Sequence, residues 1–528
     1  MSQASMSLVS GFLYSRCLLS AIAVLGSAPL WAAEPAHRLA DAAMNRDVAT
    51  VNALLAQHAN PNERGQFDTP ALQWLVSVDE VATAAKLLKA GADVNATTPL
   101  GIAALNVAVA NGNTAMTKLL LDAGANPDTL EPSGETVLMS AAAVGETGVV
   151  QALLDHGASV NARDRNFGQN ALMFAAREGH VAVVAQLLKA KAEVNVQTNA
   201  EPAPHFIAPN SVPGFGFGVG ILRGGVPADR GRREPQPGGM SPLLYATRNG
   251  HVEVAKLLLG AGAELNAREA NDIWPLLMAI SNNQMPMAEF LLQQNQVLIN
   301  GQDWYGRSPI WEAVNVRNLY VHNATLVNGI DRAPVLQLIR HLLTAGANPN
   351  VRTKETPPAR NHMLPITGTL EWVDFTGQTP FLTAAQAGDL TVMKLLLEHG
   401  ADPKINTFQG TSPLMAAAGV NWVYAQSWTE GEAQSLAAVK FCRELGMDVN
   451  QANSMGVTAL IGAANRGSDS IIRYLVEQGA DLTARDKEQR SALDWAKGVF
   501  LATHPPESKP TSMALISSLL SAQHKEVR

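Results

Sequence analysis

The chain has 528 residues, of which 47% are hydrophobic, and a formal net charge of −7 at neutral pH. Aromatic residues make up only 5% and charged residues 16%, so small and aliphatic side chains supply most of the apolar content. This length is too great for one compact core. The mildly acidic charge argues against nonspecific nucleic-acid binding, which needs clustered Lys and Arg.

The N-terminus has the composition of a secretory signal. Arg16 precedes an apolar run over residues 17–31, and two alanines at 32–33 follow it. The run is short for a membrane span. We therefore expect residues 1–33 to be a signal peptide of the Gram-negative type, and the mature protein to be periplasmic or secreted, without stable membrane insertion. Cleavage removes Cys17 and leaves Cys442 as the single remaining cysteine, which excludes an intramolecular disulfide.

After this segment, a five-residue motif recurs at intervals of about 33 residues. It reads Gly-Ala-Asp-Val-Asn at 91–95, and its variants begin at Gly124, Gly157, Gly262, Gly346, Gly400 and Gly479. A period of this length indicates a stack of small units that cannot bury their apolar faces alone. Because a stack presents a long surface rather than a single pocket, binding is the expected function.

Residues 170–195 contain the elements expected of one unit. A short helix over 170–176 is followed by a turn, and a second helix over 181–189 has its apolar residues on one side. The first helix of other units opens with Ser or Thr before Pro, a pair that caps and starts helices. The motif Gly should end the second helix in a left-handed conformation. A further Gly should form the turn between units, at 168, 306, 377, 410 and 456.

These residues are the pattern of the ankyrin repeat, and the chain resembles that family along nearly all of its length after residue 33. The opening Thr-Pro-Leu-like hexapeptide, the central Gly179-His180 and the closing motif occur in order and in phase. The resemblance implies an all-α solenoid of about twelve helix–turn–helix units. It also implies β-hairpin turns that project between the units, and degenerate N- and C-terminal caps.

The insertions define the expected domain organisation. Repeats 1–5 span 34–197, a Pro/Gly-rich insertion spans 198–239, repeats 6–11 and the start of the cap span 240–504, and the cap helix and tail span 505–528. The first insertion holds seven Pro and nine Gly, so we expect a long mobile loop at the hairpin edge. Three shorter insertions are expected at 317–333, 352–374 and 419–433. The insertions resemble those of large exported ankyrin proteins of Gram-negative bacteria.

Several of the few aromatic residues fall just before the tip Gly of a predicted hairpin. Because exposed Trp and Tyr often dominate protein interfaces, we hypothesise that these rings, with the tryptophans of the insertions, anchor a protein partner. The alternative is that each ring folds over its own loop as a small satellite core. The candidate partner-binding residues are Phe167, Trp304, Tyr305, Trp372, Phe375, Phe408, Trp422 and Trp428.

Motifs of catalysis and metal binding are absent from the sequence. There is no phosphate-binding loop, no His-Glu-x-x-His pair and no Gly-x-Ser-x-Gly turn. His180 and His251 follow the central Gly, where the resemblance implies a bond to the backbone. The Asp residues at turn tips suit turn formation, with an acidic strip that steers a basic partner as the alternative. The Asp residues concerned are 93, 128, 164, 303, 374, 402, 448 and 481.

The sequence therefore predicts an exported, monomeric scaffold that binds one or more proteins. It is not expected to be an enzyme, to need a cofactor or metal, or to bind nucleic acid. The alternative is a carbohydrate- or small-ligand-binding module in which aromatic residues of the insertions serve as stacking platforms. Those residues are Trp372, Trp422, Tyr424 and Trp428.

Overall fold

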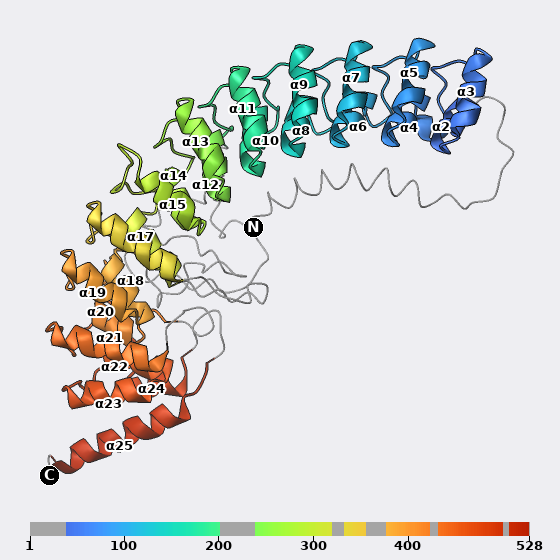
Figure 1. Ribbon diagram of the computed structural model, residues 1–528. Helices are drawn as coiled ribbons and strands as arrows, with labels where there is room; N and C mark the ends of the chain where they lie inside the picture. The colour runs from blue at the N-terminus through green and yellow to red at the C-terminus, as the bar shows by residue number, and fades with distance from the viewer. Residues whose placement is uncertain are drawn as a thin grey trace, which may run out of the picture. The chain divides into compact units, whose positions relative to one another are not determined.

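The computed structural model describes residues 38–200, 238–318, 332–354, 376–422, 431–499 and 506–526. These residues contain 24 α-helices and no β-strand, which confirms the all-α prediction. They divide into two compact units. Figure 1 shows the helices of both units, coloured by residue number. Unit 1 comprises residues 38–200 and 238–264, and unit 2 comprises the described residues from Leu265 onward.

Unit 1 consists of six helix pairs and one short 3-10 turn. Each first helix of a pair contacts the first helix of the next pair, and each second helix contacts the next second helix, so the helices form two layers. The first helices are α2 (Arg38–Met44), α4 (Ala71–Ser77), α6 (Ala104–Ala110), α8 (Val137–Val144), α10 (Ala171–Glu178) and α12 (Pro242–Asn249). The second helices are α3 (Val48–Ala56), α5 (Val81–Lys89), α7 (Thr114–Asp122), α9 (Thr147–Asp155), α11 (Val181–Lys189) and α13 (Val252–Gly260); η2 is Gln66–Asp68.

Unit 2 repeats this arrangement with six further helix pairs. The described residues therefore contain the twelve helix–turn–helix repeats that the motif predicted. Its first helices are α14 (Pro275–Ser281), α16 (Pro309–Arg317), α18 (Pro380–Ala387), α20 (Pro413–Ala418), α22 (Ala459–Arg466) and α24 (Ala492–Lys497). Its second helices are α15 (Met285–Leu292), α17 (Arg332–Thr344), α19 (Leu390–Glu398), α21 (Glu432–Glu444), α23 (Asp469–Glu477) and α25 (Pro510–Glu526).

The local sequence explains where these helices begin and end. The Ser241 hydroxyl accepts the N–H of Leu244 at 3.2 Å, and Pro242 occupies the first helical position of α12. At the other end of a repeat, the motif Gly has a positive φ, as at Gly124 (90°) and Gly479 (87°). The left-handed conformation expected of this Gly is therefore confirmed.

The predicted β-hairpin turns are present in reduced form. In the described residues they contain five isolated antiparallel bridges, such as that between Ala452 and Thr458, which are too short to be strands. In several turns one polar side chain closes the turn by accepting the N–H four residues later. Thr407 Oγ1 accepts from Thr411 at 3.0 Å, and Asn453 Oδ1 accepts from Val457 at 3.0 Å.

The two insertions on the hairpin side leave this turn closed at their base. Thr198 Oγ1 accepts the N–H of Met240 at 2.9 Å, and Thr353 Oγ1 accepts that of Gln378 at 2.9 Å. Each makes the same bond as Thr407, but its partner lies 42 or 25 positions along the chain instead of four. The repeat therefore continues in frame across both insertions. The insertion segments 201–237, 319–331, 355–375 and 423–430 lie outside the described residues, so the mobile loop expected at the first stays a prediction.

Within each unit, an asparagine at the end of the motif joins neighbouring repeats. Asn95 donates from Nδ2 to the carbonyl oxygen of Gly124 at 3.1 Å, and its Oδ1 accepts the N–H of Asn126 at 3.0 Å. The same pair of bonds recurs at Asn62, Asn161, Asn195, Asn266, Asn300, Asn350 and Asn450. We call this series the asparagine ladder.

The predicted signal peptide, residues 1–33, lies outside the described residues. Among the helices that the structure does describe, none combines the length and apolar character needed to cross a bilayer.

Candidate partner-binding surface

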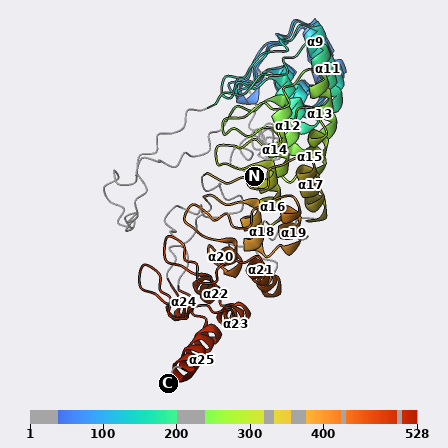
Figure 2. The ribbon, with the colours of Figure 1, turned by 90° about the vertical axis from the view of Figure 1, so that its left-hand side faces the viewer.

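The tips of successive hairpins are bonded to one another through their backbones. In unit 2, the N–H of Lys354 donates to the carbonyl of Tyr305 at 2.8 Å, and the N–H of Phe408 donates to that of Thr376 at 3.1 Å. Similar bonds join Trp304 to Asn271, Ser454 to Gln409 and Lys487 to Met455. Figure 2 shows the loops that carry these tips projecting from one side of the helices. The hairpins therefore place their tip residues in a row.

Two of the candidate aromatic residues are exposed at this edge. The Phe408 side chain is 60% exposed, and the guanidinium of Arg352 lies over its ring, 4.2 Å from the centroid. In unit 1 the Phe167 side chain is 49% exposed. Both have the accessibility that the anchoring hypothesis requires.

The remaining described candidates are less accessible. Tyr305 is only 5% exposed, since it packs edge to face against Trp304 with ring centroids 5.0 Å apart, and Arg307 lies 5.4 Å from its ring centroid. Burial raises the pKa of Tyr305 to about 12. Tyr305 is therefore not an exposed anchor and fits the satellite-core alternative. Trp304 and Trp422 are half-buried, and the guanidinium of Arg466 lies 5.9 Å from the Trp422 ring centroid. Trp372, Phe375, Tyr424 and Trp428 lie outside the described residues.

The structure adds two exposed apolar residues that sequence reasoning missed. In unit 1, Phe67 is 58% and Leu100 is 61% exposed. Like Phe167, each directly precedes a hairpin-tip residue with a positive φ, which is Asp68, Gly101 or Gly168; Phe67 itself also has a positive φ of 61°. The position of Leu100 directly before a tip Gly could have identified it from the sequence. Phe67 could not be identified in this way, because Asp68 occupies the position of the tip Gly. We call Phe67, Leu100 and Phe167 the unit 1 tip residues.

Buried charges hold the hairpin behind Tyr305. Arg307 Nε lies 2.7 Å from Asp303 Oδ2, its Nη1 lies 3.5 Å from Glu312 Oε1, and all three side chains are at most 5% exposed. The Ser281 hydroxyl donates to Glu312 at 2.8 Å. Burial raises the pKa of Asp303, opposed by the adjacent guanidinium. This network is almost entirely buried, so it stabilises the turn rather than forming a site.

Turn formation accounts for the acidic residues at the tips. Asp93, Asp402 and Asp481 each accept the N–H two residues later at 2.8–2.9 Å, and Asp164 and Asp303 are buried. Asp374 lies outside the described residues. The alternative of an acidic strip therefore loses two of its members to the interior.

The histidines after the central Gly bond the preceding repeat, as expected. The Nε2 atom of His180 lies 3.0 Å from the carbonyl oxygen of Ala143, and that of His251 lies 3.0 Å from the carbonyl oxygen of Arg177. Burial raises the pKa of the Cys442 thiol, which is inaccessible. Across the residues described, no three His, Cys, Asp or Glu side chains converge as ligands of a metal ion would.

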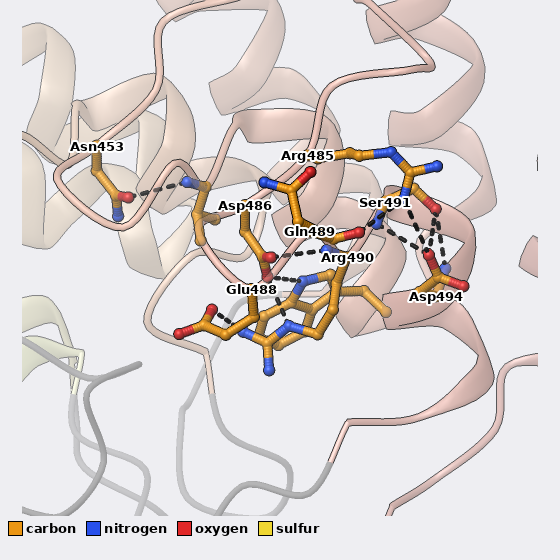
Figure 3. Close-up of polar contacts among 10 residues, drawn as sticks. Asn453, Arg485, Asp486, Glu488, Gln489, Arg490, Ser491 and Asp494 are labelled. Atoms are coloured by element: carbon orange, nitrogen blue, oxygen red, sulfur yellow. Dashed lines mark hydrogen bonds and ion pairs between the residues drawn. The ribbon is translucent and has the colours of Figure 1, made fainter. Parts of the chain in front are cut away.

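A second charged network closes the last hairpin (Figure 3). Asp486 Oδ2 accepts from Arg490 Nε at 2.7 Å and from the Trp495 indole at 2.8 Å. Arg490 also lies over Trp495, 4.6 Å from the ring centroid. Nearby, the Asp494 carboxylate accepts from Lys497 at 2.9 Å and from the Ser491 hydroxyl at 2.8 Å. These contacts fix the end of the stack.

Sequence comparison with known families agrees with this architecture. The family model described as three copies of ankyrin repeats matches residues 39–129, 105–198 and 243–331, and the single ankyrin-repeat model matches 376–407 and 455–487. The chain belongs to the ankyrin repeat family. Ankyrin repeats are protein–protein interaction scaffolds, which is the class of function that the fold defines.

Curated relatives match part of the chain. It is 28% identical over 263 residues to the ankyrin repeat and KH domain-containing protein mask-1 of Caenorhabditis elegans, covering 49% of this chain and 8% of that protein. It is 31% identical over 126 residues to neurogenic locus notch homolog protein 1 of Xenopus laevis and of Mus musculus, covering 24% of this chain and 4% of each relative. The chain thus spans less than a tenth of the length of these relatives.

Proposed function

We propose that this chain is an exported scaffold that binds a protein partner along its hairpin edge, as a monomer and without catalysing a reaction. The observation that carries the proposal is the exposure of the unit 1 tip residues, which occupy equivalent positions in three hairpins, with Ser133 at that position in the hairpin between Leu100 and Phe167. Three large apolar side chains from different repeats occupy the same exposed position. Aligned exposed apolar groups mark interaction surfaces, whereas single ones need no explanation.

The proposal is tested by site-specific crosslinking in cells. A photo-reactive phenylalanine analogue replaces Phe67, Phe167 or Phe408, and the captured proteins are identified by mass spectrometry. Val181, which is 41% exposed at the start of the second helix α11, is the matched control. We expect one recurrent partner at the tip positions and none at position 181. Equal capture at position 181, or no partner at any tip, would contradict the proposal.

Export is tested separately by fractionation of a bacterial host. The composition of residues 1–33 supports cleavage, so the mature chain should be recovered outside the cytoplasm with its N-terminus near Glu34. Deleting residues 2–33 should retain the chain in the cytoplasm. Recovery of uncleaved full-length chain in the cytoplasm would contradict export without affecting the binding proposal.

A further inference from the structure

The Arg352 side chain is fixed in place at the hairpin edge of unit 2. Its Nε donates to the carbonyl oxygen of Gly377 at 3.2 Å, and its Nη2 donates to that of Asn406 at 2.7 Å. The guanidinium also lies over the Phe408 ring, 4.2 Å from the centroid. A guanidinium has further N–H donors, and the described residues supply no acceptor for those of Arg352. The group is therefore held rigidly while part of its bonding capacity stays unused.

Arginines at the equivalent position of other repeats show that the missing acid is a particular feature of this one. Arg352 lies two residues after Asn350, the last residue of its motif, and three other repeats pair an arginine at that position with a nearby carboxylate. The pairs are Arg64 with Asp68 at 3.2 Å, Arg268 with Asp272 at 3.4 Å and Arg485 with Asp494 at 3.9 Å. Arg352 instead donates only to carbonyl oxygens, which carry no net charge.

Arg163 has the same backbone bonds as Arg352 but lacks the ring contact. It donates from Nε to the carbonyl oxygen of Gly168 at 2.8 Å and from Nη2 to that of Gln197. Among the described residues, no aromatic ring lies over its guanidinium. Holding the hairpins together therefore does not require an exposed ring, so the exposed ring at Arg352 calls for another explanation.

The charge around Arg352 is not neutralised by the described residues. The carboxylate of the next motif, Asp402, accepts the N–H of Lys404 at 2.9 Å and forms no ion pair with Arg352. Lys354, exposed two residues after Arg352, adds a second positive charge at the same hairpin. This part of the edge therefore attracts an acidic group.

The exposed ring adds an apolar requirement to this positive charge. The Phe408 side chain is 60% exposed, although it lies against the guanidinium. Covering such a ring with an apolar side chain removes both from water. A carboxylate accepts strong, charge-assisted bonds from a guanidinium. A segment that offers both groups side by side is complementary to the ring and the cation together.

We propose that Phe408 and Arg352 form one binding site for a partner segment in which an Asp or Glu lies next to an apolar residue. The apolar side chain covers the Phe408 ring, and the carboxylate accepts N–H bonds from the Arg352 guanidinium. The inference rests on the proposed function, since it names the chemistry of the partner at one part of the hairpin edge.

A peptide library displayed on phage tests the site with the full chain. Random decapeptides are selected on the wild-type chain and on Phe408→Ala, and the peptides that only the wild type recovers are sequenced. We expect these peptides to be enriched in Asp or Glu next to an apolar residue. Recovery of peptides without this enrichment, or of no peptide that depends on Phe408, would overturn the proposal.

Synthetic pairs of the recovered peptides, with Glu or Gln at the acidic position, then test Arg352 by fluorescence polarisation. We expect the Glu peptide to bind about fivefold more tightly, as partly exposed ion pairs provide. Arg352→Gln should remove that preference. Arg485→Gln is the matched control, because this arginine of the same unit is already paired with Asp494, and it should keep the preference. Raising the ionic strength should reduce the preference on the wild type, a readout that needs no variant.

A preference for Glu that survives Arg352→Gln, or that does not respond to salt, would also overturn the proposal. The insertion at 355–375 tests an occupant within the chain, since it contains Glu355, Glu371 and Asp374. If their joint replacement by Gln and Asn tightened peptide binding, the insertion rather than a partner would be the occupant. If tip crosslinks recur while the peptide pairs are not distinguished, only this site fails, and the scaffold stands.

Discussion

At the scale of single residues, the asparagine ladder shows how one side chain joins two repeats. Each member satisfies a carbonyl oxygen and an N–H of the next repeat's motif with one amide, as Asn350 does with Gly400 and Asp402 at 2.9 and 2.7 Å. Lys404 occupies the equivalent position in the next motif, and its ammonium group has no acceptor for the N–H of Asp448. The ladder is therefore interrupted between α19 and α21.

We predict that Lys404→Asn completes this step of the ladder. Two hydrogen bonds at an exposed site should stabilise the adjacent repeats by about 0.5–1.5 kcal/mol, and Asn350→Ala should destabilise its neighbours by a similar amount. Hydrogen exchange of α18–α21 measures both effects. Lys404→Gln, whose amide lies one methylene further out, is the control and should give no gain. A gain with Gln equal to that with Asn would point to the lost charge instead.

The pH dependence of the last repeat follows from Asp494. Hydrogen bonds from Lys497 and then from Ser491 lower the pKa of Asp494 from its ordinary value of 3.8 to about 2. Because the folded-state pKa is depressed, the carboxylate contributes stability that is complete above about pH 4 and is lost as the pH falls toward 2. We predict that Asp494→Asn lowers protection of α24 and α25 at neutral pH and flattens their loss of protection over that window. Hydrogen exchange at a series of pH values measures it, and an unchanged acid slope in the variant would refute the assignment.

At the scale of elements, the structure separates two kinds of glycine. A Cβ at the helix-ending Gly124 (φ 90°) would meet nothing within 4 Å, and His58 and Lys191 occupy the same place in other repeats with φ of 61° and 64°. A Cβ at the tip Gly377 (φ 78°) would lie 2.8 Å from the backbone nitrogen of Phe408. Gly124 is needed only because its backbone is left-handed. Gly377 is needed for the same reason and because a side chain there would collide with the next hairpin.

The pair Gly124→Val and Gly377→Val should therefore differ in effect. Gly124→Val incurs only the left-handed strain of about 1–2 kcal/mol, whereas Gly377→Val adds a steric cost of about 1–3 kcal/mol. We expect Gly377→Val to lower protection in two repeats and Gly124→Val mainly in one, as measured by hydrogen exchange. Equal losses would mean that the hairpin can move away from Phe408 without cost.

The elements that the sequence predicted are those whose conformation is set within one repeat. The Ser241 cap, the left-handed Gly124 and the contact of His180 with Ala143 each depend on a residue in the same or the adjacent motif, so the period reveals them. The twelve helix pairs follow for the same reason.

The contacts that the sequence did not predict are those between residues that the repeat period does not relate. Arg317 bonds Asp389 at 2.8 Å across 72 positions, and Asp389 stands where His180 stands in its own repeat. The burial of Tyr305 results from its packing on Trp304 and Arg307, which no local pattern records. The sequence therefore predicted that the hairpin-tip position is exposed in general, but not which individual tip side chains are buried.

The neck of the first long insertion gives a prediction for a whole element. Thr198 also exchanges backbone bonds with Met240 and Gly239 at 3.0 and 3.1 Å, so the turn closes independently of the residues between. We predict that deletion of residues 205–236 leaves far-UV helicity unchanged. Thr198→Val, which loses one bond at the neck, should lower the protection of α12 instead. A collapse of helicity after the deletion would show that the deleted residues are part of the repeat stack.

At the scale of the whole molecule, stability should be a sum over neighbouring repeats. In each unit a helix contacts its own partner and the adjacent repeats, so among the described residues no single core spans either unit. Damage should then stay close to the substituted repeat. This property also suits a long binding surface, because one weakened repeat leaves the hairpins of distant repeats in place.

Leu120→Ala and Leu396→Ala test this locality. Both side chains are fully buried, in α7 of unit 1 and in α19 of unit 2, so each truncation should destabilise its surroundings by about 2–5 kcal/mol. Hydrogen exchange should show lost protection around α5–α9 for Leu120→Ala and around α17–α21 for Leu396→Ala, with the other unit unchanged in each case. Each variant is thus the control for the other. If either one lowered protection throughout both units, the chain would unfold as one cooperative body, and the nearest-neighbour account of its stability would be wrong.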